Sequence, residues 1–127
     1  MKSMNESELS NHIAEALGYY LTLGDLYCPA MNAFVVFNSI GFQHLVRKSR
    51  RKSRSSSECI NRLVYLRYVT EVVTKSEKVY EMRVHGNKVY WYALVYKVED
   101  GVIVRVVLQR IGIGKIVFLS VMPHREL

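Results

Sequence analysis

The chain has 127 residues, of which 50% are hydrophobic and 23% charged, a composition typical of one globular domain with its own core. Its net charge of +7 favours a polyanionic partner, with phosphate groups as the first candidate. No apolar run reaches the ~20 residues that span a bilayer and no signal peptide opens the chain, which predicts a cytoplasmic protein without a membrane partner. The two cysteines and four scattered histidines predict neither a disulfide scaffold nor a metal site, so we expect no cofactor.

The first part of the chain predicts a helix followed by a short strand. Over residues 5–23 apolar side chains such as Leu9 and Ile13 recur at three- and four-residue spacing, and Gly24 is typical of a helix end. The run Ala33–Phe37 is apolar and rich in β-branched and aromatic residues, which predicts a strand.

The most basic part of the chain comes next. Asn38 or Ser39 is expected to cap a second helix from Ile40 onward, and His44 and Lys48 share one face of it because they are four residues apart. The cations that follow are concentrated in residues 47–54, called the basic segment below: Arg47, Lys48, Arg50, Arg51, Lys52 and Arg54. Such a concentration of positive charge is the electrostatic footprint of a phosphate-bearing partner.

The rest of the chain predicts one more helix and then a sheet. Ser55 with Glu58 is typical of a capping box, so a third helix is expected to continue to about Thr74. The β-branched stretches 79–84, 89–98, 102–110 and 116–122 are separated by short glycine-containing turns and predict a four-stranded antiparallel meander. The predicted fold is therefore α+β in a single domain, with a helical part at about 5–75 packed on an antiparallel sheet at about 79–122.

Several polar residues interrupt the apolar strands of this sheet. Strand alternation puts Arg105 and Gln109 on one face and Arg110 on the other, and it puts Phe118 and Ser120 together on the last strand. A solvent-facing side of the sheet and a functional site explain these polar residues equally well.

Some of these segments carry a resemblance to a known group of enzymes. The matching pieces are Gly41-Phe42-Gln43-His44-Leu45, Arg47-Lys48, Arg62, the Arg105–Arg110 strand and Phe118-Leu119-Ser120-Val121-Met122. In this order, over about residues 33–122, the chain resembles the phage-associated nucleases of the Barnase–EndoU–colicin–RelE group. The resemblance implies helices on a four-stranded antiparallel sheet and a toxin-like, metal-independent endoribonuclease. Gln109 departs from the pattern, because a basic residue is expected there.

Metal-free RNA cleavage needs few chemical groups. The 2′-hydroxyl attacks the adjacent phosphorus, so one group accepts its proton, another protonates the leaving oxygen, and cations stabilise the phosphorane. We expect His44, Lys48, Arg105 and Ser120 to converge as the catalytic residues, but no second acid–base residue is evident. Arg62, Gln109 and the basic segment are expected to bind RNA, and a cognate inhibitor or antitoxin protein is a further expected partner.

Two other classes of protein fit the same residues. One is a non-catalytic RNA-binding module that uses the basic segment together with stacking aromatic residues, for which Tyr90, Tyr92 and Tyr96 line one face. Core packing explains such a stripe as well, and a central strand over 89–98 is expected to bury the Trp91 ring. The other is a structural or interaction protein whose basic segment is a solvated loop or binds anionic lipid.

The basic segment leads to a first prediction, on RNA binding. Replacing Arg50, Arg51, Lys52 and Arg54 by serine should flatten the dependence of RNA affinity on salt, because fewer phosphate contacts release fewer counterions. Fluorescence anisotropy of a labelled RNA over a series of salt concentrations measures this slope. A slope equal to that of the unchanged chain would remove the segment from the RNA interface.

Overall fold

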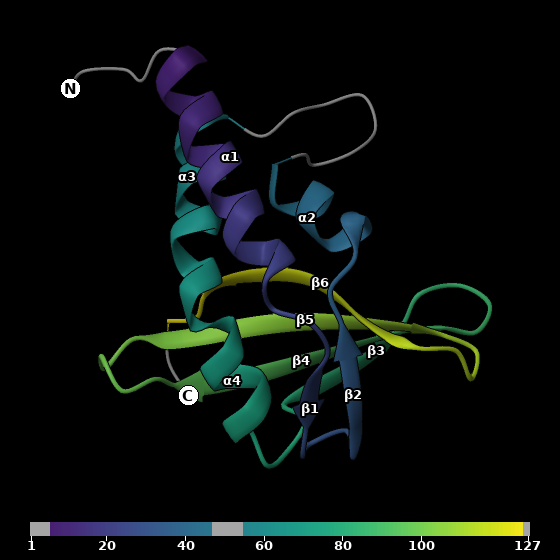
Figure 1. Cartoon of the computed structure of the whole chain (residues 1–127). Coiled ribbons are helices and arrows are strands. Elements are labelled where there is room, and N and C mark those ends of the chain that lie inside the picture. Colours follow the sequence, from purple (N-terminus) through teal and green to yellow (C-terminus); the bar gives the residue numbers. More distant parts are fainter. Residues whose placement is uncertain (1–5, 47–54, 126–127) are drawn as a thin grey trace.

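The computed structural model describes residues 6–46 and 55–125, and its fold is α+β as predicted. The helices are α1 (Glu6–Leu21), α2 (Ser39–Val46), α3 (Ser56–Tyr65), the 3₁₀ turn η1 (Leu66–Tyr68) and α4 (Val69–Lys75). The strands are β1 (Leu26–Cys28), β2 (Ala33–Val36), β3 (Glu81–Val84), β4 (Val89–Lys97), β5 (Ile103–Ile111) and β6 (Ile116–Pro123). Figure 1 shows α1, α2 and α3 on the same side of the sheet. Within the described ranges, no helix is both long enough and apolar enough to cross a bilayer.

The sheet is larger than the sequence predicts. Its strand order is β1-β2-β6-β5-β4-β3, and β3 to β6 form the predicted antiparallel meander. The prediction that these four strands make up the whole sheet is wrong, because β2 adds to the edge of β6 in parallel and β1 then pairs with β2. Val35 of β2 is fully buried, so joining the sheet removes this apolar strand from water.

The predicted third helix begins where expected but does not run on unbroken. The Ser55 side chain accepts a hydrogen bond from the Glu58 backbone N–H at 3.2 Å, which confirms the N-terminal cap. The helix tightens into η1 at Leu66–Tyr68 and then continues as α4. With this break, α3 packs against β6 while α4 packs against β1, β4 and β5.

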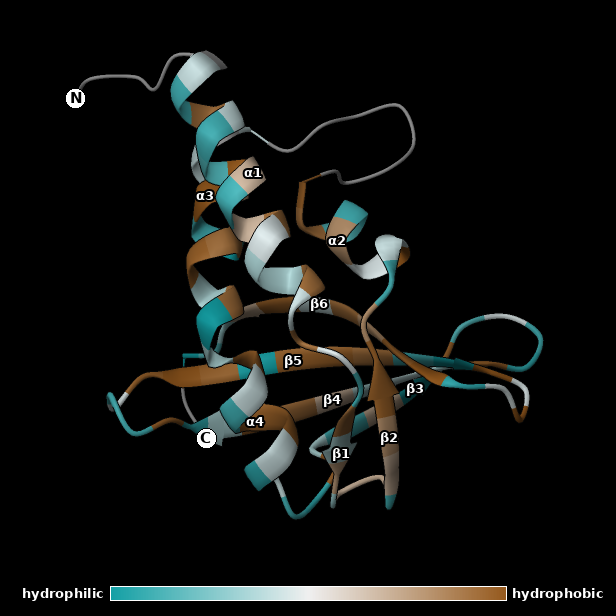
Figure 2. Ribbon diagram, in the orientation of Figure 1, coloured by the Kyte–Doolittle hydropathy of each residue, from teal (hydrophilic) through white to brown (hydrophobic). Residues whose placement is uncertain are grey.

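The hydrophobic core lies between the helices and one face of the sheet. On β5, Val104, Val106 and Leu108 are fully buried and belong to this core, which also includes residues of α2, α3 and α4. Figure 2 shows that hydrophobic residues dominate β2 and most of β5, whereas the loop between β3 and β4 is largely hydrophilic. Arg105 and Gln109 alternate with the core residues and lie on the other side, called the open face below.

A β-bulge in β6 overturns one prediction from strand alternation. Phe118 pairs with Leu108, whereas Ser120 pairs with Val107, so Leu119 is an extra residue in β6. Phe118 therefore faces the core, and Ser120 belongs to the opposite register. The prediction that Phe118 and Ser120 share a face is wrong, because the extra residue shifts the alternation by one position.

The aromatic residues of β4 are also distributed differently from the prediction. Tyr92 and Tyr96 pack against the core, so they do not form a stacking surface. Trp91 pairs with Gln109 and lies half-buried on the open face, not in the core as a central strand led us to expect. The aromatic residue that β4 presents on the open face is therefore Trp91, and the tyrosines lie on the other face.

Gly41 allows α2 to approach β6 very closely. A Cβ atom at Gly41 would lie 2.3 Å from the Phe118 carbonyl oxygen and 2.8 Å from the Tyr20 hydroxyl oxygen, and neither distance is sterically possible. Tyr20 is itself fixed, since its hydroxyl donates to the Asn38 carbonyl at 2.6 Å and its ring packs against Phe42. Burial raises the pKa of the Tyr20 hydroxyl, so this group remains a neutral donor. Glycine at position 41 is thus explained by packing.

The contact at Gly41 leads to a second prediction, on stability. Gly41→Ala should lower the free energy of unfolding by about 1–3 kcal/mol or more, because the methyl group meets rigid backbone at the bulge. Gly18→Ala is the matched control, since nothing lies within 4 Å of a Cβ there and alanine favours a helix over glycine. Chemical denaturation followed by circular dichroism measures both. Equal stability of the two variants would contradict the close approach of α2 to β6.

Candidate active site on the open face of the sheet

The structure does not bring His44 and Arg105 together. His44 lies half-buried on α2, whose neighbouring residues Phe42 and Leu45 belong to the core. Arg105 lies on the open face, so the sheet separates the two side chains. Lys48 and the other residues of the basic segment lie outside the described residues. Alternate side chains of β5 point to opposite faces of the sheet, and Arg105 points away from the face on which α2 lies. His44 and Arg105 therefore cannot line the same pocket.

Ser120 and Arg62 are brought together instead. The Arg62 Nη1 atom donates to the Ser120 hydroxyl at 2.9 Å and to the Val121 carbonyl at 3.3 Å. Arg62 can reach this part of β6 because β2 pairs only with Ile116 and Val117. Ser120 is 6% exposed, so its hydroxyl serves mainly to hold α3 on the end of β6.

A pocket of about 290 Å³ lies on the open face, and charged, imidazole and indole side chains from three strands line it. Glu81 and Arg83 come from β3, and His85 follows directly after the strand. These three residues alternate with Met82 and Val84, so they point to one side. Trp91 of β4 and Arg105 of β5 complete this group, because the cross-strand register places both on the same face.

A carboxylate lies between two guanidinium groups in this pocket. The Glu81 Oε1 atom accepts hydrogen bonds from Arg83 Nε at 3.0 Å and from Arg105 Nη2 at 2.9 Å. These bonds, first that from Arg83 and then that from Arg105, lower the pKa of Glu81 below its ordinary value. Their stabilisation is present above the pKa of the unfolded chain and is lost as pH falls through the lowered folded-state pKa. Arg83 is exposed and the Glu81–Arg105 pair is only partly buried, so these ion pairs contribute little to stability and mainly orient the three side chains.

An aromatic pair adjoins the charged group. The rings of His85 and Trp91 lie with their centroids 3.9 Å apart. The Trp91 Nε1–H donates to the Gln109 side-chain oxygen at 2.9 Å, which fixes the plane of the indole ring. Gln109, predicted from the sequence to bind RNA, thus positions Trp91.

The sequence interpretation missed Glu81, Arg83 and His85. The signal was available in Glu81-Met82-Arg83-Val84-His85, where every second residue is titratable or charged. This alternation shows that the three residues share a face of the strand, but only the pairing of β3 with β4 and of β4 with β5 brings that face next to Trp91 and Arg105. Glu81 and His85 therefore place a carboxylate and an imidazole, two groups able to transfer protons, in one pocket.

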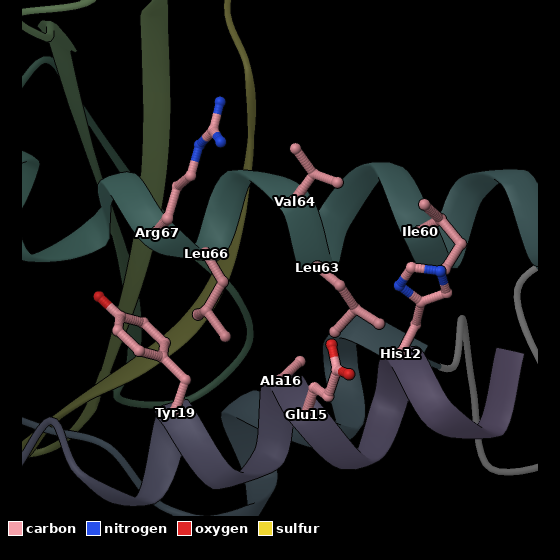
Figure 3. A pocket seen from close by; sticks show the side chains of 9 residues that line it. All are labelled: His12, Glu15, Ala16, Tyr19, Ile60, Leu63, Val64, Leu66 and Arg67. Carbon is pink, nitrogen blue, oxygen red and sulfur yellow. The ribbon is translucent and has the colours of Figure 1, made fainter. Parts of the chain in front are cut away.

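A second hollow, of about 280 Å³, lies between α1 and α3, and most of the side chains that line it are apolar. Figure 3 shows Ala16, Leu63 and Leu66 between the two helices, with His12 and Glu15 projecting from α1. Arg67 points away from α1 and donates to the Tyr68 hydroxyl at 2.6 Å. A predominantly apolar hollow with one guanidinium, directed elsewhere, is poorly suited to holding phosphate.

Neither a family model, nor a curated protein, nor a solved structure matches the chain. In the described part of the chain, no three His, Cys, Asp or Glu side chains are grouped so that they could hold a metal ion. Any statement of function therefore rests on the chemistry of the open-face pocket.

The ion pairs at Glu81 lead to a third prediction, on anion binding. Glu81→Gln should bind sulfate more tightly than the unchanged protein at neutral pH, because Arg83 and Arg105 no longer have an internal anion as partner. The unchanged protein should bind sulfate more tightly as pH falls through the lowered pKa of Glu81, and the variant should lack this rise. Isothermal titration calorimetry measures both affinities.

Glu77→Gln provides the control, since Glu77 is an exposed carboxylate that does not line the pocket. Equal sulfate affinity in all three proteins would mean that Arg83 and Arg105 do not form an anion site.

Proposed function

We propose that the protein is a metal-independent endoribonuclease whose active site is the open-face pocket. The observation that carries the proposal is that one pocket holds a carboxylate, an imidazole and two guanidinium groups: Glu81, His85, Arg83 and Arg105. This is the set that RNA cleavage by internal attack requires, and the protein supplies all of it with its own side chains.

The reaction assigns one role to each group. Arg83 and Arg105 bind the non-bridging oxygens of the phosphate that is attacked, and Glu81 accepts the proton of the 2′-hydroxyl as its oxygen bonds to phosphorus. His85, in its protonated form, donates a proton to the 5′-oxygen as the bond from phosphorus to that oxygen breaks. The products are a 2′,3′-cyclic phosphate and a free 5′-hydroxyl, so the atoms and protons balance.

The ion pairs of Glu81 fit this use of the pocket. While Arg83 and Arg105 donate to it, the Glu81 carboxylate is a weak base because its pKa is lowered. A phosphate that takes over the two guanidinium groups removes these donors, and the basicity of Glu81 rises when the substrate is in place. The basic segment would attract RNA toward the protein through its charge, and the net charge of +7 favours an acidic protein as a cognate inhibitor.

A cleavage assay in the presence of EDTA gives the fourth prediction. A mixed RNA should be cleaved with and without chelator, and both Glu81→Gln and His85→Ala should reduce kcat by about 10²–10⁴-fold, the range for a lost acid–base group. Arg105→Ala should weaken both turnover and RNA binding, because a phosphate contact acts in the ground state and in the transition state.

His44→Ala is the informative comparison. Cleavage at the wild-type rate is expected, because α2 lies on the other side of the sheet from the pocket. Loss of cleavage in His44→Ala, together with full activity in His85→Ala, would return the active site to α2 and overturn the present assignment.

A second candidate is RNA binding without cleavage. The contact between His85 and Trp91 favours it, because the imidazole lies against the indole ring, with the centroids 3.9 Å apart. Salt-dependent RNA binding at Arg83 and Arg105, with no cleavage product in any variant, would establish this candidate in place of the enzyme.

A further inference from the structure

We infer that Trp91 is the stacking site for an unpaired nucleobase of the RNA, and that His85 occupies this site until RNA binds. This inference rests on the proposed function, because it assigns the base subsite next to the phosphate site of the same pocket.

The first ground is the position and rigidity of Trp91. Its ring lies half-buried on the open face, where strand alternation separates it from the core residue Leu94. The hydrogen bond to Gln109 holds the indole in one orientation, so little conformational entropy is lost when a base stacks on it. A fixed, partly exposed aromatic ring on a sheet is a typical platform for single-stranded nucleic acid.

The second ground is the neighbourhood of the ring. Trp91 pairs directly with Arg83 of β3, and Arg105 lies on the same face of β5. A cross-strand neighbour is about 5 Å away between Cβ atoms, so the phosphate held by Arg83 lies within one nucleotide of the ring. Base and phosphate subsites that adjoin in this way match the covalent structure of a nucleotide.

The third ground is the part played by His85. Its ring lies against Trp91, with the centroids 3.9 Å apart and an angle of 31° between the ring planes, so it covers part of the surface on which a base would stack. His85 is exposed and follows the end of β3, so its side chain can turn away without disturbing the sheet. A base that displaces the imidazole from Trp91 would leave it available to the 5′-oxygen of the phosphate at Arg83 and Arg105.

The inference specifies the class of RNA. A base can lie on Trp91 only after it has left its own stack and its pairing partner, so unpaired RNA is the substrate and duplex RNA is a poor ligand. Base binding and the release of His85 are one event in this scheme, so the acid becomes available only when a nucleotide is bound.

The single tryptophan of the chain makes the inference testable by fluorescence in the intact protein. Titration with adenosine 5′-monophosphate should quench Trp91 emission in a saturable way, whereas ribose 5-phosphate, which lacks the base, should not. A single-stranded 2′-O-methyl RNA, which lacks the attacking hydroxyl, should quench more strongly than its duplex. Trp91→Ala should bind adenosine 5′-monophosphate about 5- to 150-fold more weakly by calorimetry, the range for one stacked base.

Variants of two histidines test whether a base displaces His85 from Trp91 or only binds beside it. His85→Ala should bind adenosine 5′-monophosphate at least as tightly as the unchanged protein, because the internal occupant of the ring is gone, while its cleavage activity is lost. His12→Ala, in which an exposed histidine of α1 is changed, should leave both properties unchanged. This pair also keeps the inference testable if Trp91→Ala fails to fold.

The inference and the proposed function fail in different ways. Quenching by the nucleotide in a protein that cleaves no RNA would retain the base subsite and remove the enzyme. Cleavage without quenching, or equal quenching by ribose 5-phosphate, would overturn the base subsite. Much weaker nucleotide binding in His85→Ala would mean that the imidazole is part of the platform and not its temporary occupant.

Discussion

The two-residue periodicity of β5 is the constraint on which the site depends. Val104, Val106 and Leu108 must face the helices, because together with the buried residues of α4 they form the centre of the core. The residues between them are therefore committed to the other side of the sheet, whatever their chemistry. Arg105 is placed on the open face by the burial of its neighbours, and no rotation of the strand could move it toward His44 without exposing the core.

On the open face, charged and aromatic side chains lie outside the core, and the helices in the described part of the chain do not cover them. These side chains pair with one another: Glu81 accepts bonds from Arg83 and Arg105, and His85 covers one side of Trp91. Each internal partner resembles part of a nucleotide, since a carboxylate resembles a phosphate in charge and an imidazole resembles a base in shape. Under the function that we propose, a nucleotide would replace both at once, whereas an isolated phosphate or an isolated base would replace one. Such replacement would lower affinity for simple anions and favour ligands that carry both groups.

The Gly-Phe-Gln-His-Leu run illustrates how a motif can be explained by packing. Gly41 lies where a Cβ atom would meet the Phe118 carbonyl oxygen, and Phe42 and Leu45 are buried in the core. Three of its five residues are thus accounted for by the contact between α2 and β6. The glycine and the two buried apolar residues of this run allow the short helix α2 to pack closely on the bulged strand β6. The acid and base that we propose, His85 and Glu81, lie instead at the two ends of the less conspicuous run 81–85.

The sequence by itself determined the elements whose cause is local. The cap at Ser55, the turns of the meander and the β-branched strands depend on neighbouring residues, and the α+β class follows from their order. Alternation likewise placed Arg105 and Gln109 on one face correctly. Only the tertiary structure decided the parallel pairing of β2 with β6, the bulge that turns Ser120 away from Phe118, and the union of Glu81, His85 and Arg105 in one pocket. These features depend on contacts between residues far apart in the chain, whose energies a local pattern does not contain.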